Sequence, residues 1–250
     1  MSASAIALVT GASRGIGAAT ARLLAQQGYA LGLNYHRNRA AAEALASELR
    51  AGGTRCITLQ ADIGDEAQVV AMFQQLDAEL GPLSLLVNNA AILQPQSPIS
   101  GISAARFAAI LQINVIGTFL CCQQAVQRMR TDLGGQGGVI VNVSSGAAKS
   151  GSPHEYIDYA ASKGAVDTLT RGLALEVAAQ GIRVNAVRPG FIYTDMHADG
   201  GEPGRVDRLK SRIPLGRGGE AAEVAQAIAW LASSAASYTT GSFIDVCGGV

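Results

Sequence analysis

Residues 6–17 read Ile6-Ala7-Leu8-Val9-Thr10-Gly11-Ala12-Ser13-Arg14-Gly15-Ile16-Gly17, a short apolar run followed by a turn with three glycines. An alanine-rich stretch with helical spacing continues to about Gln27. Glycine permits a tight turn and a close approach of the backbone, and the N-terminus of a helix attracts phosphate. The spacing differs from the dinucleotide fingerprint G-x-G-x-x-G, and the Lys-Ser/Thr ending of a P-loop is absent. A strand, a glycine turn and a helix in this order predict nucleotide binding; the alternative is a plain tight turn.

The end of the second expected strand indicates which nucleotide binds. Folds of this kind that use NAD place an Asp or Glu there to hold the ribose hydroxyls. The stretch Leu33-Asn34-Tyr35-His36-Arg37 contains no acid, which would repel a 2′-phosphate. Because Arg37 and Arg14 can pair with that phosphate, NADP (NADPH) is favoured, and NAD is possible. The alternative for each arginine is a solvated surface charge.

Strand-like and helix-like segments alternate along the whole chain. Strands are expected at 6–10, 29–35, 55–60, 83–88, 139–143, 183–187 and 242–246. Helices are expected at 16–27, 39–51, 66–80, 104–131, 156–179 and 221–232. The strands are continuous apolar runs, which is typical of parallel strands buried on both faces. The pattern predicts an α/β fold, a doubly wound parallel (Rossmann-like) sheet of about seven strands with helices on both faces, formed by residues 1–250 as a single domain.

Composition narrows the expected partners and compartment. The chain has 19 basic and 19 acidic residues and no basic cluster, so neither nucleic acid nor an anionic membrane is an expected partner. No apolar run is expected to reach the ~20 residues that span a bilayer, and Met1 to Ala5 lead directly into a strand without a secretory signal. The cysteines and histidines lack metal-ligand spacing, so no metal is expected. These observations predict a cytoplasmic protein.

Two of the expected helices are apolar nearly all round. A helix without a solvated face is usually buried on both sides. One side packs on the sheet, and the other is expected to meet another subunit, in a homo-oligomer such as a dimer or homotetramer. The alternative is that loops of the same chain cover these faces. The apolar residues are Phe107, Ile110, Leu111, Ile113, Val115, Ile116, Phe119 and Leu120 in the first helix and Ala160, Ala165, Val166, Leu169, Leu173, Ala174 and Val177 in the second.

Tyr159 and Lys163 lie four residues apart in the second of these helices, and therefore on the same helix face. A free phenol has a pKa near ~10 and is a poor acid or base at neutral pH. A fixed ammonium beside it favours the phenolate, and a second positive charge such as an oxidised nicotinamide ring would add to that effect. The pair alone is common by chance, so its assignment depends on the rest of the chain.

Seven motifs in order resemble the short-chain dehydrogenase/reductase family over essentially the whole chain. Tyr159-x-x-x-Lys163 is similar to the catalytic pair of that family. The other matching positions are Thr10-Gly11-x-x-x-Gly15-x-Gly17, Asp62-Ile63, Asn88-Asn89-Ala90-Ala91, Asn114, Ser144-Ser145, and Pro189-Gly190 with Thr194.

This resemblance implies hydride transfer between nicotinamide C4 and the carbon of a carbonyl or alcohol substrate. Tyr159 would exchange a proton with the substrate oxygen, and Lys163 would lower the tyrosine pKa and hold the nicotinamide ribose. Ser145 would hydrogen-bond the substrate oxygen, and its alternative is a cap at the end of the strand. Asn114 would hold a relay water; its alternative is a polar side chain that locally satisfies or kinks a buried helix. The implied cofactor contacts are Gly11, Ser13, Arg14, Gly15, Ile16, Gly17, Asn34, Tyr35, His36, Arg37, Asp62, Ile63, Asn89, Ala90, Ala91, Tyr159, Lys163, Pro189, Gly190, Ile192 and Thr194.

Two departures from the family pattern stand out. The spacing from Ser145 to Tyr159 is one residue longer than usual, which places an extra residue in the loop between Lys149 and Glu155. Ala91 replaces a glycine and adds a methyl group near the cofactor. Tyr156 competes with Tyr159 for the acid role, but it lies two helical turns from Lys163 rather than one.

The segment 191–219 is rich in glycine and charge and is expected to form a mobile lid over a polar substrate. The alternative is an ordinary helical excursion with a solvated face. His154 and Glu155 are expected to be a solvated loop pair, and the alternative is that they line the pocket.

A second hypothesis for the function is a catalytically silent, NAD(P)-binding regulatory protein on the same fold. The presence of both Tyr159 and Lys163 argues against it. The identity of the substrate is not indicated.

Overall fold

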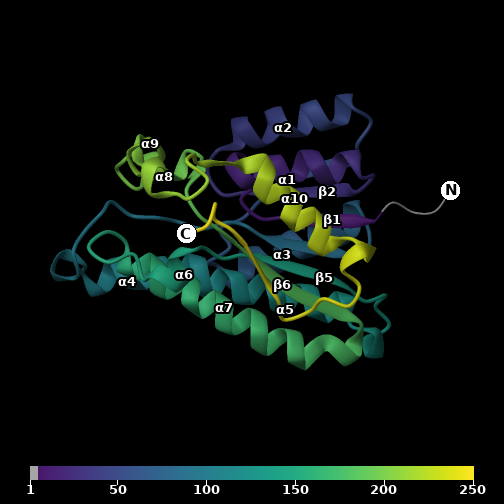
Figure 1. Ribbon diagram of the computed structural model, residues 1–250. Helices are drawn as coiled ribbons and strands as arrows, with labels where there is room; N and C mark the ends of the chain where they lie inside the picture. Colours follow the sequence, from purple (N-terminus) through teal and green to yellow (C-terminus); the bar gives the residue numbers. More distant parts are fainter. Residues whose placement is uncertain (1–4) are drawn as a thin grey trace.

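Seven parallel strands form the central sheet of the protein (Figure 1). The computed structural model describes residues 5–250. The order of the strands across the sheet is β3-β2-β1-β4-β5-β6-β9, so the chain reverses its direction of travel between β1 and β4. The expected doubly wound α/β fold is confirmed. The strands are β1 (Ile6–Val9), β2 (Ala30–Tyr35), β3 (Cys56–Gln60), β4 (Leu85–Asn88), β5 (Gly138–Val143), β6 (Ile182–Pro189) and β9 (Phe243–Val246).

Helices cover both faces of the sheet (Figure 1). One face carries α1 (Gly15–Gln26), α2 (Arg39–Ala51) and α10 (Ala221–Ala232). The other carries α3 (Glu66–Glu79), α5 (Thr118–Met129) and α7 (Ile157–Val177), with α4 (Ala104–Leu111) beside them. Side-chain oxygens of Asn38, Asp65 and Ser103 accept hydrogen bonds at the first turns of α2, α3 and α4. Such caps fix where a helix starts and contribute about 1 kcal/mol each.

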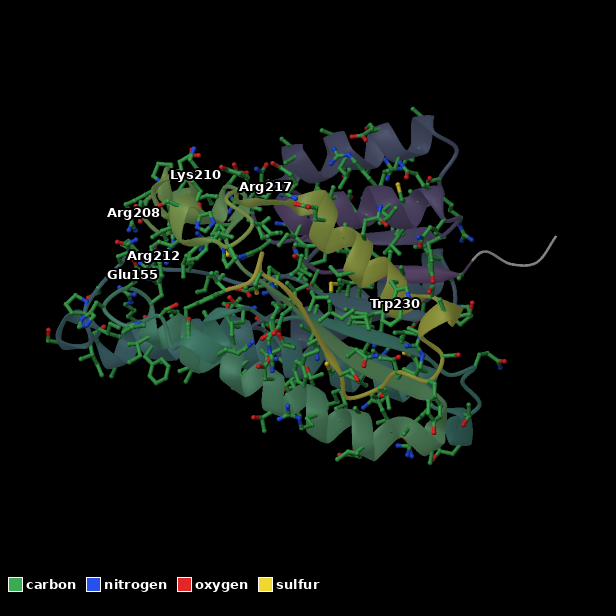
Figure 2. All side chains as sticks on the ribbon, viewed as in Figure 1. Glu155, Arg208, Lys210, Arg212, Arg217 and Trp230 are labelled. Atoms are coloured by element: carbon green, nitrogen blue, oxygen red, sulfur yellow. The ribbon has the colours of Figure 1, made fainter. Side chains whose placement is uncertain are left out.

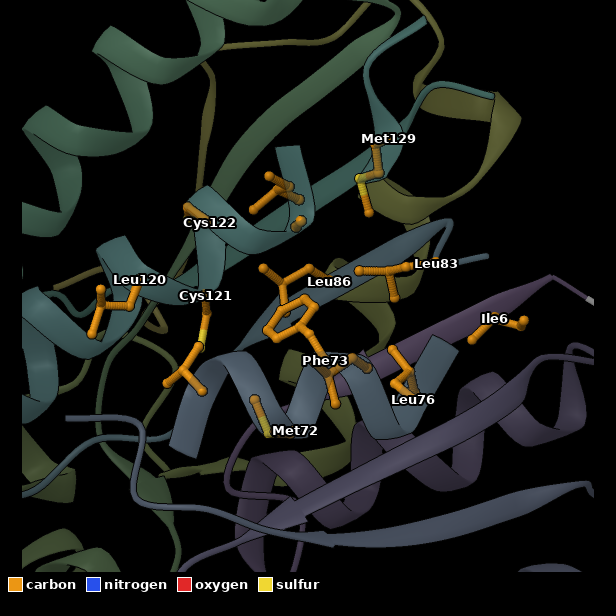
Figure 3. Close-up of a cluster of buried hydrophobic side chains, with 14 of the residues drawn as sticks. Ile6, Met72, Phe73, Leu76, Leu83, Leu86, Leu120, Cys121, Cys122 and Met129 are labelled. Carbon is orange, nitrogen blue, oxygen red and sulfur yellow. The ribbon is translucent and has the colours of Figure 1, made fainter. Parts of the chain in front are cut away.

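A cluster of apolar side chains fills the space between the sheet and α3, α5 and α7. Figure 3 shows side chains gathered around the ring of Phe73, among them Leu86 of β4 and Cys121 and Cys122 of α5. The Phe73 side chain is fully buried. Full burial of one such side chain stabilises the fold by about 1.5–3 kcal/mol. A second cluster lies under α1, α2 and α10, so the sheet is buried on both faces.

The expected helix at 104–131 is interrupted. A π-helical turn, Gln112–Gly117, separates α4 from α5, and the last turn of α5 ends at Met129. The Thr118 hydroxyl donates to the Asn114 carbonyl at 2.9 Å, and the Asn114 amide is bonded outside its own helix. A polar side chain that competes for backbone groups in this way loosens the regular ladder. This interruption agrees with the alternative considered for Asn114, a polar side chain that locally satisfies or kinks a buried helix.

The expectation that no apolar segment reaches the length of a bilayer span is wrong. The helical stretch Ala104–Met129 has 26 residues and contains an 18-residue window with a mean hydropathy of 1.6 and few charges, which is enough by length and composition. Polar residues such as Gln112 and Asn114 break the continuous apolar run, but they do not lower the mean hydropathy below the level expected of a membrane span. The helix packs on the sheet through Leu120, Cys121 and Ala125, which belong to the buried core.

The segment between β6 and α10 contains elements that were not expected. Strands β7 (Ile192–Tyr193) and β8 (Gly219–Glu220) pair in parallel and bracket it. Helices α8 (Met196–Asp199) and α9 (Arg205–Leu209) lie between them. A further short helix, α6 (Ala147–Ser150), follows β5. Elements of two to five residues are too short to show a hydrophobic period. Single 3-10 turns lie at Ile99–Gly101, Thr131–Leu133, Ala178–Gln180, Lys210–Arg212 and Ser234–Ala236.

Candidate active site

The glycine turn lies at the carboxyl end of β1, where it is packed too tightly for larger residues. Gly11 has a φ of +62°, a backbone angle that residues with a side chain rarely adopt. A Cβ atom at Gly17 would lie 2.4 Å from the Gly11 carbonyl oxygen and 2.6 Å from the Asn89 amide nitrogen. The turn therefore brings bare backbone to the start of α1, which is the arrangement that accommodates a pyrophosphate.

Neighbouring side chains hold the turn in place. The Gly11 amide donates to Asn34 Oδ1 at 3.1 Å, and Asn34 Nδ2 donates to the carbonyls of Leu59 and Ala61. Asn89 Nδ2 donates to the carbonyls of Thr10 and Gly11, and the Thr10 hydroxyl accepts from the amides of Asn89 and Ala90. The side chains of Asn34 and Asn89 are thus occupied by the protein itself, which gives them a supporting role.

The predicted phosphate-binding residues have different surroundings. Arg37 is exposed at the end of β2, and within residues 5–250 it has no ion-pair partner. Arg14 instead makes an ion pair with Asp199 of α8 and lies 3.9 Å from an oxygen of Asp195. His36 is exposed, with its Nε2 3.6 Å from an oxygen of Asp62.

Three of the predicted contacts turn their side chains into the fold. Tyr35 and Ile63 are buried, and Ile63 belongs to the apolar cluster under α3. The Asp62 carboxylate accepts from the Gly64 amide and so shapes the turn after β3.

Three of the four predicted catalytic residues, Ser145, Tyr159 and Lys163, line one cavity of about 450 Å³, and Asn114 is not among its lining residues. Ser145 follows β5, and Tyr159 and Lys163 lie one turn apart on α7. Lys163 is 3% exposed, and its Nζ donates to the Val143 carbonyl at 2.8 Å and lies 5.6 Å from the centre of the Tyr159 ring. Ser145 Oγ accepts from the Ala147 amide at 3.1 Å, which leaves its own proton free to be donated.

Burial opposes ionisation of both Tyr159 and Lys163. The surrounding protein raises the pKa of Tyr159 to about 12, against the opposing effect of its interaction with the Ser145 side chain. Burial likewise lowers the pKa of Lys163 to about 8, although the nearby Asp167 carboxylate acts in the opposite direction. The lysine was expected to lower the tyrosine pKa; in this structure desolvation is the larger effect. At neutral pH the tyrosine is therefore a proton donor and the lysine is charged.

Asp167 is a buried acid that sequence reasoning missed. It accepts from the Ser144 hydroxyl at 2.6 Å and forms an ion pair with Arg188 at 2.8 Å. It lies one helical turn beyond Lys163, on the same face of α7. The i, i+4 spacing of Lys163 and Asp167 was the available signal.

The Asn114 side chain is fully engaged. Its Oδ1 accepts from the Ile92 amide at 2.8 Å, and its Nδ2 donates to the Ile92 carbonyl and to Ser162 Oγ, both at 3.1 Å. Asn114 thus connects the interrupted helix to the loop after β4 and to α7. This arrangement is the locally satisfied, helix-distorting side chain that was considered as the alternative to a relay.

Tyr156 and Glu155 bind the segment 191–219. The Tyr156 hydroxyl donates to the Gly200 carbonyl at 3.0 Å, so it is occupied away from the catalytic pair. Glu155 forms ion pairs with Arg205 and Arg208 of α9 and borders the cavity, so the expectation of a solvated pair is wrong for Glu155. His154 is exposed, as expected.

The loop before α7 has an unusual backbone. Gly151, Ser152 and His154 have φ values of +74°, +43° and +66°. Left-handed angles at residues other than glycine cost about 1–3 kcal/mol each. They fall where an extra residue was expected between Ser145 and Tyr159.

The rest of the cavity wall comes from residues predicted to contact the cofactor and from the segment 191–219. Pro189, Gly190, Ile192 and Thr194 line it as predicted positions, together with Ile16 and Ala91. Sequence reasoning noted the charge of the segment but did not find Arg205 and Arg212 as wall residues. No local pattern separates these two arginines from their neighbours.

Several known proteins resemble this chain over nearly its full length. An Escherichia coli (strain K12) protein named uncharacterized oxidoreductase YgfF is 63% identical, over 98% of this chain and 99% of its own length. The cis-4-hydroxycyclohexanecarboxylate dehydrogenase of Sinomonas cyclohexanicum is 41% identical, over 98% of this chain and 95% of its own.

Solved structures resemble this chain in fold as well as in sequence. A blue fluorescent protein from a metagenomic library, in complex with NADPH, has a TM-score of 0.89 at 38% identity and covers 98% of this chain and 97% of its own. A 3-ketoacyl-(acyl-carrier-protein) reductase from Brucella melitensis, complexed with NADH, has a TM-score of 0.90 at 32% identity and covers 98% and 97%.

A family profile described as enoyl-(acyl carrier protein) reductase matches residues 11–250. The motifs, the fold and these likenesses agree: the chain belongs to the short-chain dehydrogenase/reductase family.

Proposed function

We propose that this protein is an NADP-dependent oxidoreductase that transfers a hydride between nicotinamide and a carbonyl or secondary alcohol substrate. The observation that carries this proposal is that Ser145, Tyr159 and Lys163 line the same cavity as Ile16 at the glycine turn. The relatives named above are oxidoreductases, and the blue fluorescent protein binds NADPH.

The residues at the turn fit a dinucleotide. The close backbone at Gly11 and Gly17 leaves room for a pyrophosphate at the N-terminus of α1, and the exposed guanidinium of Arg37, which has no ion pair within residues 5–250, suits a 2′-phosphate. When bound, the nicotinamide supplies the hydride chemistry. The side chains of Asn34 and Asn89 hold the turn that receives it.

Tyr159 acts as the acid in reduction. With its pKa raised to about 12, its hydroxyl stays protonated at neutral pH and can give its proton to the substrate oxygen. Ser145 donates a hydrogen bond to the same oxygen and stabilises the negative charge that develops on it. Oxidation of an alcohol needs the phenolate, which the charge of Lys163 favours.

Two groups keep Lys163 in position and charged. The Val143 carbonyl accepts a hydrogen bond from Lys163 Nζ at 2.8 Å. The Asp167 carboxylate favours the charged form of Lys163, whereas burial disfavours it. Asn114 donates a hydrogen bond to Ser162 Oγ of α7 and so fixes its own helical turn against α7. We propose that Asn114 holds the water that links Lys163 to solvent through its backbone carbonyl, because its side chain is already bonded.

A variant pair tests the proposed chemistry. NADPH oxidation is measured against ketones, aldehydes, diketones and ketoacyl thioesters with wild type, Tyr159→Phe and Tyr156→Phe. General acid catalysis contributes about 10²–10⁴-fold, so Tyr159→Phe should lose at least that factor while still binding NADPH. Tyr156→Phe loses one bond to Gly200 and should keep most of the activity. Equal activity of Tyr159→Phe and wild type would refute the assignment.

We further propose that the protein is a cytoplasmic homo-oligomer that works as one domain with a mobile lid at 191–219. Phe107, Ile116 and Phe119, on the stretch Ala104–Met129, remain 37%, 41% and 49% exposed within residues 5–250. Burial against a second subunit would remove this apolar surface from water. Light scattering at micromolar concentration tests the proposal, and a monomer would contradict it.

A further inference from the structure

Four cations lie close together on α9 and the 3-10 turn that follows it. Figure 2 shows three of them, Arg208, Lys210 and Arg212, at the same end of the molecule as Glu155. Arg208 is paired with Glu202 and Glu155, and Lys210 is paired with Asp207. The fourth, Arg205, is paired with Glu155.

Arg212 differs from these neighbours. Within residues 5–250 it has neither an ion pair nor a side-chain hydrogen bond. It is also one of the residues that line the cavity containing Ser145 and Tyr159, whereas Arg208 and Lys210 do not line it. The one cation of this group without a carboxylate partner therefore borders the space where the substrate reacts.

Arg205 adds a second observation on the same wall. Its side chain is 7% exposed, and its guanidinium lies 4.8 Å from the centre of the Tyr156 ring and 5.5 Å from that of Phe191. Its Nη1 is buried and has no hydrogen-bond partner among the described residues, although Glu202 Oε2 lies 3.7 Å away. A buried donor without a hydrogen bond is destabilising, so a closer acceptor would stabilise the wall.

The same cavity is lined by the reacting groups and by these cations. Ser145 follows β5 and Tyr159 belongs to α7, whereas Arg205 and Arg212 belong to the segment 191–219. Apolar side chains, among them Leu93, Phe191 and Leu209, line the cavity as well. A substrate that fits this pattern has a reacting carbon, an apolar body and an anionic end.

We propose that the substrate carries an anionic oxygen group remote from the reacting carbon, which binds Arg212. This inference rests on the proposed oxidoreductase function. A guanidinium binds a carboxylate or a phosphate through two parallel, charge-assisted hydrogen bonds. A small oxo acid supplies a carboxylate, and an acyl thioester of a phosphate-bearing carrier supplies a phosphate.

The test compares acidic and neutral substrates in matched variants. The acid is 4-oxocyclohexanecarboxylate, because a relative is named as a dehydrogenase of the corresponding hydroxy acid. The neutral analogue is its carboxamide, and the phosphate-bearing probe is acetoacetyl-coenzyme A. The variants are Arg212→Gln, the conservative Arg212→Lys, and Lys210→Gln, which removes the same charge from a cation that does not line the cavity.

The expected result is a selective loss. A charged hydrogen-bonding pair contributes about 1.5–3 kcal/mol, so Arg212→Gln should lower kcat/KM for an anionic substrate by about 10–100-fold, mainly through KM. Arg212→Lys should lose less of kcat/KM than Arg212→Gln does. The kcat/KM of Lys210→Gln should stay within about 2-fold of wild type. The carboxamide should be affected little. A loss with the acid assigns a carboxylate, and a loss with the thioester alone assigns a phosphate.

A binding measurement keeps the inference independent of turnover. Cyclohexanecarboxylate, which has no carbonyl to reduce, is titrated by calorimetry into NADP-saturated wild type and Arg212→Gln. The variant should bind it at least about 10-fold more weakly, and thermal melting should show both proteins equally folded. Equal binding of this acid and equal kcat/KM for all three substrates would overturn the inference. If wild type turns over none of the three substrates but still binds cyclohexanecarboxylate more tightly than Arg212→Gln does, the oxidoreductase proposal is refuted and the anion site is not.

Discussion

The glycine turn and the segment 191–219 form two sides of one cavity, and they are held by different forces. At the turn, backbone atoms of Thr10 and Gly11 are bonded to the amides of Asn34 and Asn89. In the segment, by contrast, Arg205 and Arg208 are held by ion pairs to Glu155, a residue about 50 positions away.

The glycine turn is held by steric exclusion, whereas the segment 191–219 is held by electrostatic attraction. A turn that excludes a Cβ atom has one geometry, whereas partly exposed ion pairs can break and re-form at a cost of about 1 kcal/mol or less. We infer that the turn is the fixed side of the site and that the segment is the side that opens for the substrate.

The largest predicted effect tests the fixed side. Gly17→Ala places a methyl group against the Gly11 carbonyl and the Asn89 amide, so the turn must shift. A shift of about 1 Å costs on the order of 10²-fold in a positioned site, so NADPH binding measured by fluorescence titration should weaken by about that factor.

Gly204→Ala is the matched control in the opposite segment. No heavy atom lies within 4 Å of a Cβ built at Gly204, and the backbone angle there is ordinary. NADPH affinity should therefore be unchanged. If the two alanine variants bind NADPH equally well, the turn is not the rigid side.

The same contrast explains how much the sequence could predict. The glycines of the turn, the apolar strands and the one-turn spacing of Tyr159 and Lys163 depend on neighbours close in the chain, and these features can be read locally. The partners of Arg205, and the bonds that occupy the Asn114 side chain, join segments far apart, and they depend on the folded arrangement. The sequence pattern therefore predicted the sheet and the candidate catalytic pair, but missed Asp167, the π-helical turn and the arginine wall.

The next largest effect concerns cofactor choice. Arg37 is free to pair with a 2′-phosphate, whereas Arg14 is already paired with Asp199. Arg37→Gln should weaken NADPH binding by about 10–100-fold, as for loss of a charged hydrogen bond, with little change for NADH. Arg14→Gln should cost NADPH less, since it also releases the ion pair with Asp199. Equal losses of NADPH and NADH in Arg37→Gln would contradict the phosphate role.

A smaller effect is expected in the pH dependence of carbonyl reduction. Lys163 has a pKa lowered to about 8 by burial, so it is charged below that pH and loses its charge above it. Tyr159, with its pKa raised to about 12, stays protonated over the same range. If catalysis needs the charged lysine, kcat/KM should fall about tenfold per pH unit above about 8.

Asp167→Asn isolates the cause of that pH dependence. Because the Asp167 carboxylate favours the charged form of Lys163, its removal should move the fall in kcat/KM to lower pH. A purely structural role of Asp167 would lower the rate equally at every pH. Arg188 is the other charge bonded to Asp167, and Arg188→Gln reports how much of the effect comes from the ion pair itself.

The smallest effect tests the side that opens. Glu155→Gln removes the main counter-ion of buried Arg205, while Glu202 remains 3.7 Å from it. Glu155 is partly exposed, so the loss is about 1 kcal/mol, which corresponds to an increase of about 5-fold in KM with kcat changed less. Trypsin should also cut the segment 195–212 faster than in wild type. His154→Gln, at the exposed neighbour, should change neither KM nor the cutting rate. A fall in NADPH affinity in Glu155→Gln would show instead that the two sides of the cavity are coupled, and that the turn does not hold its geometry by itself.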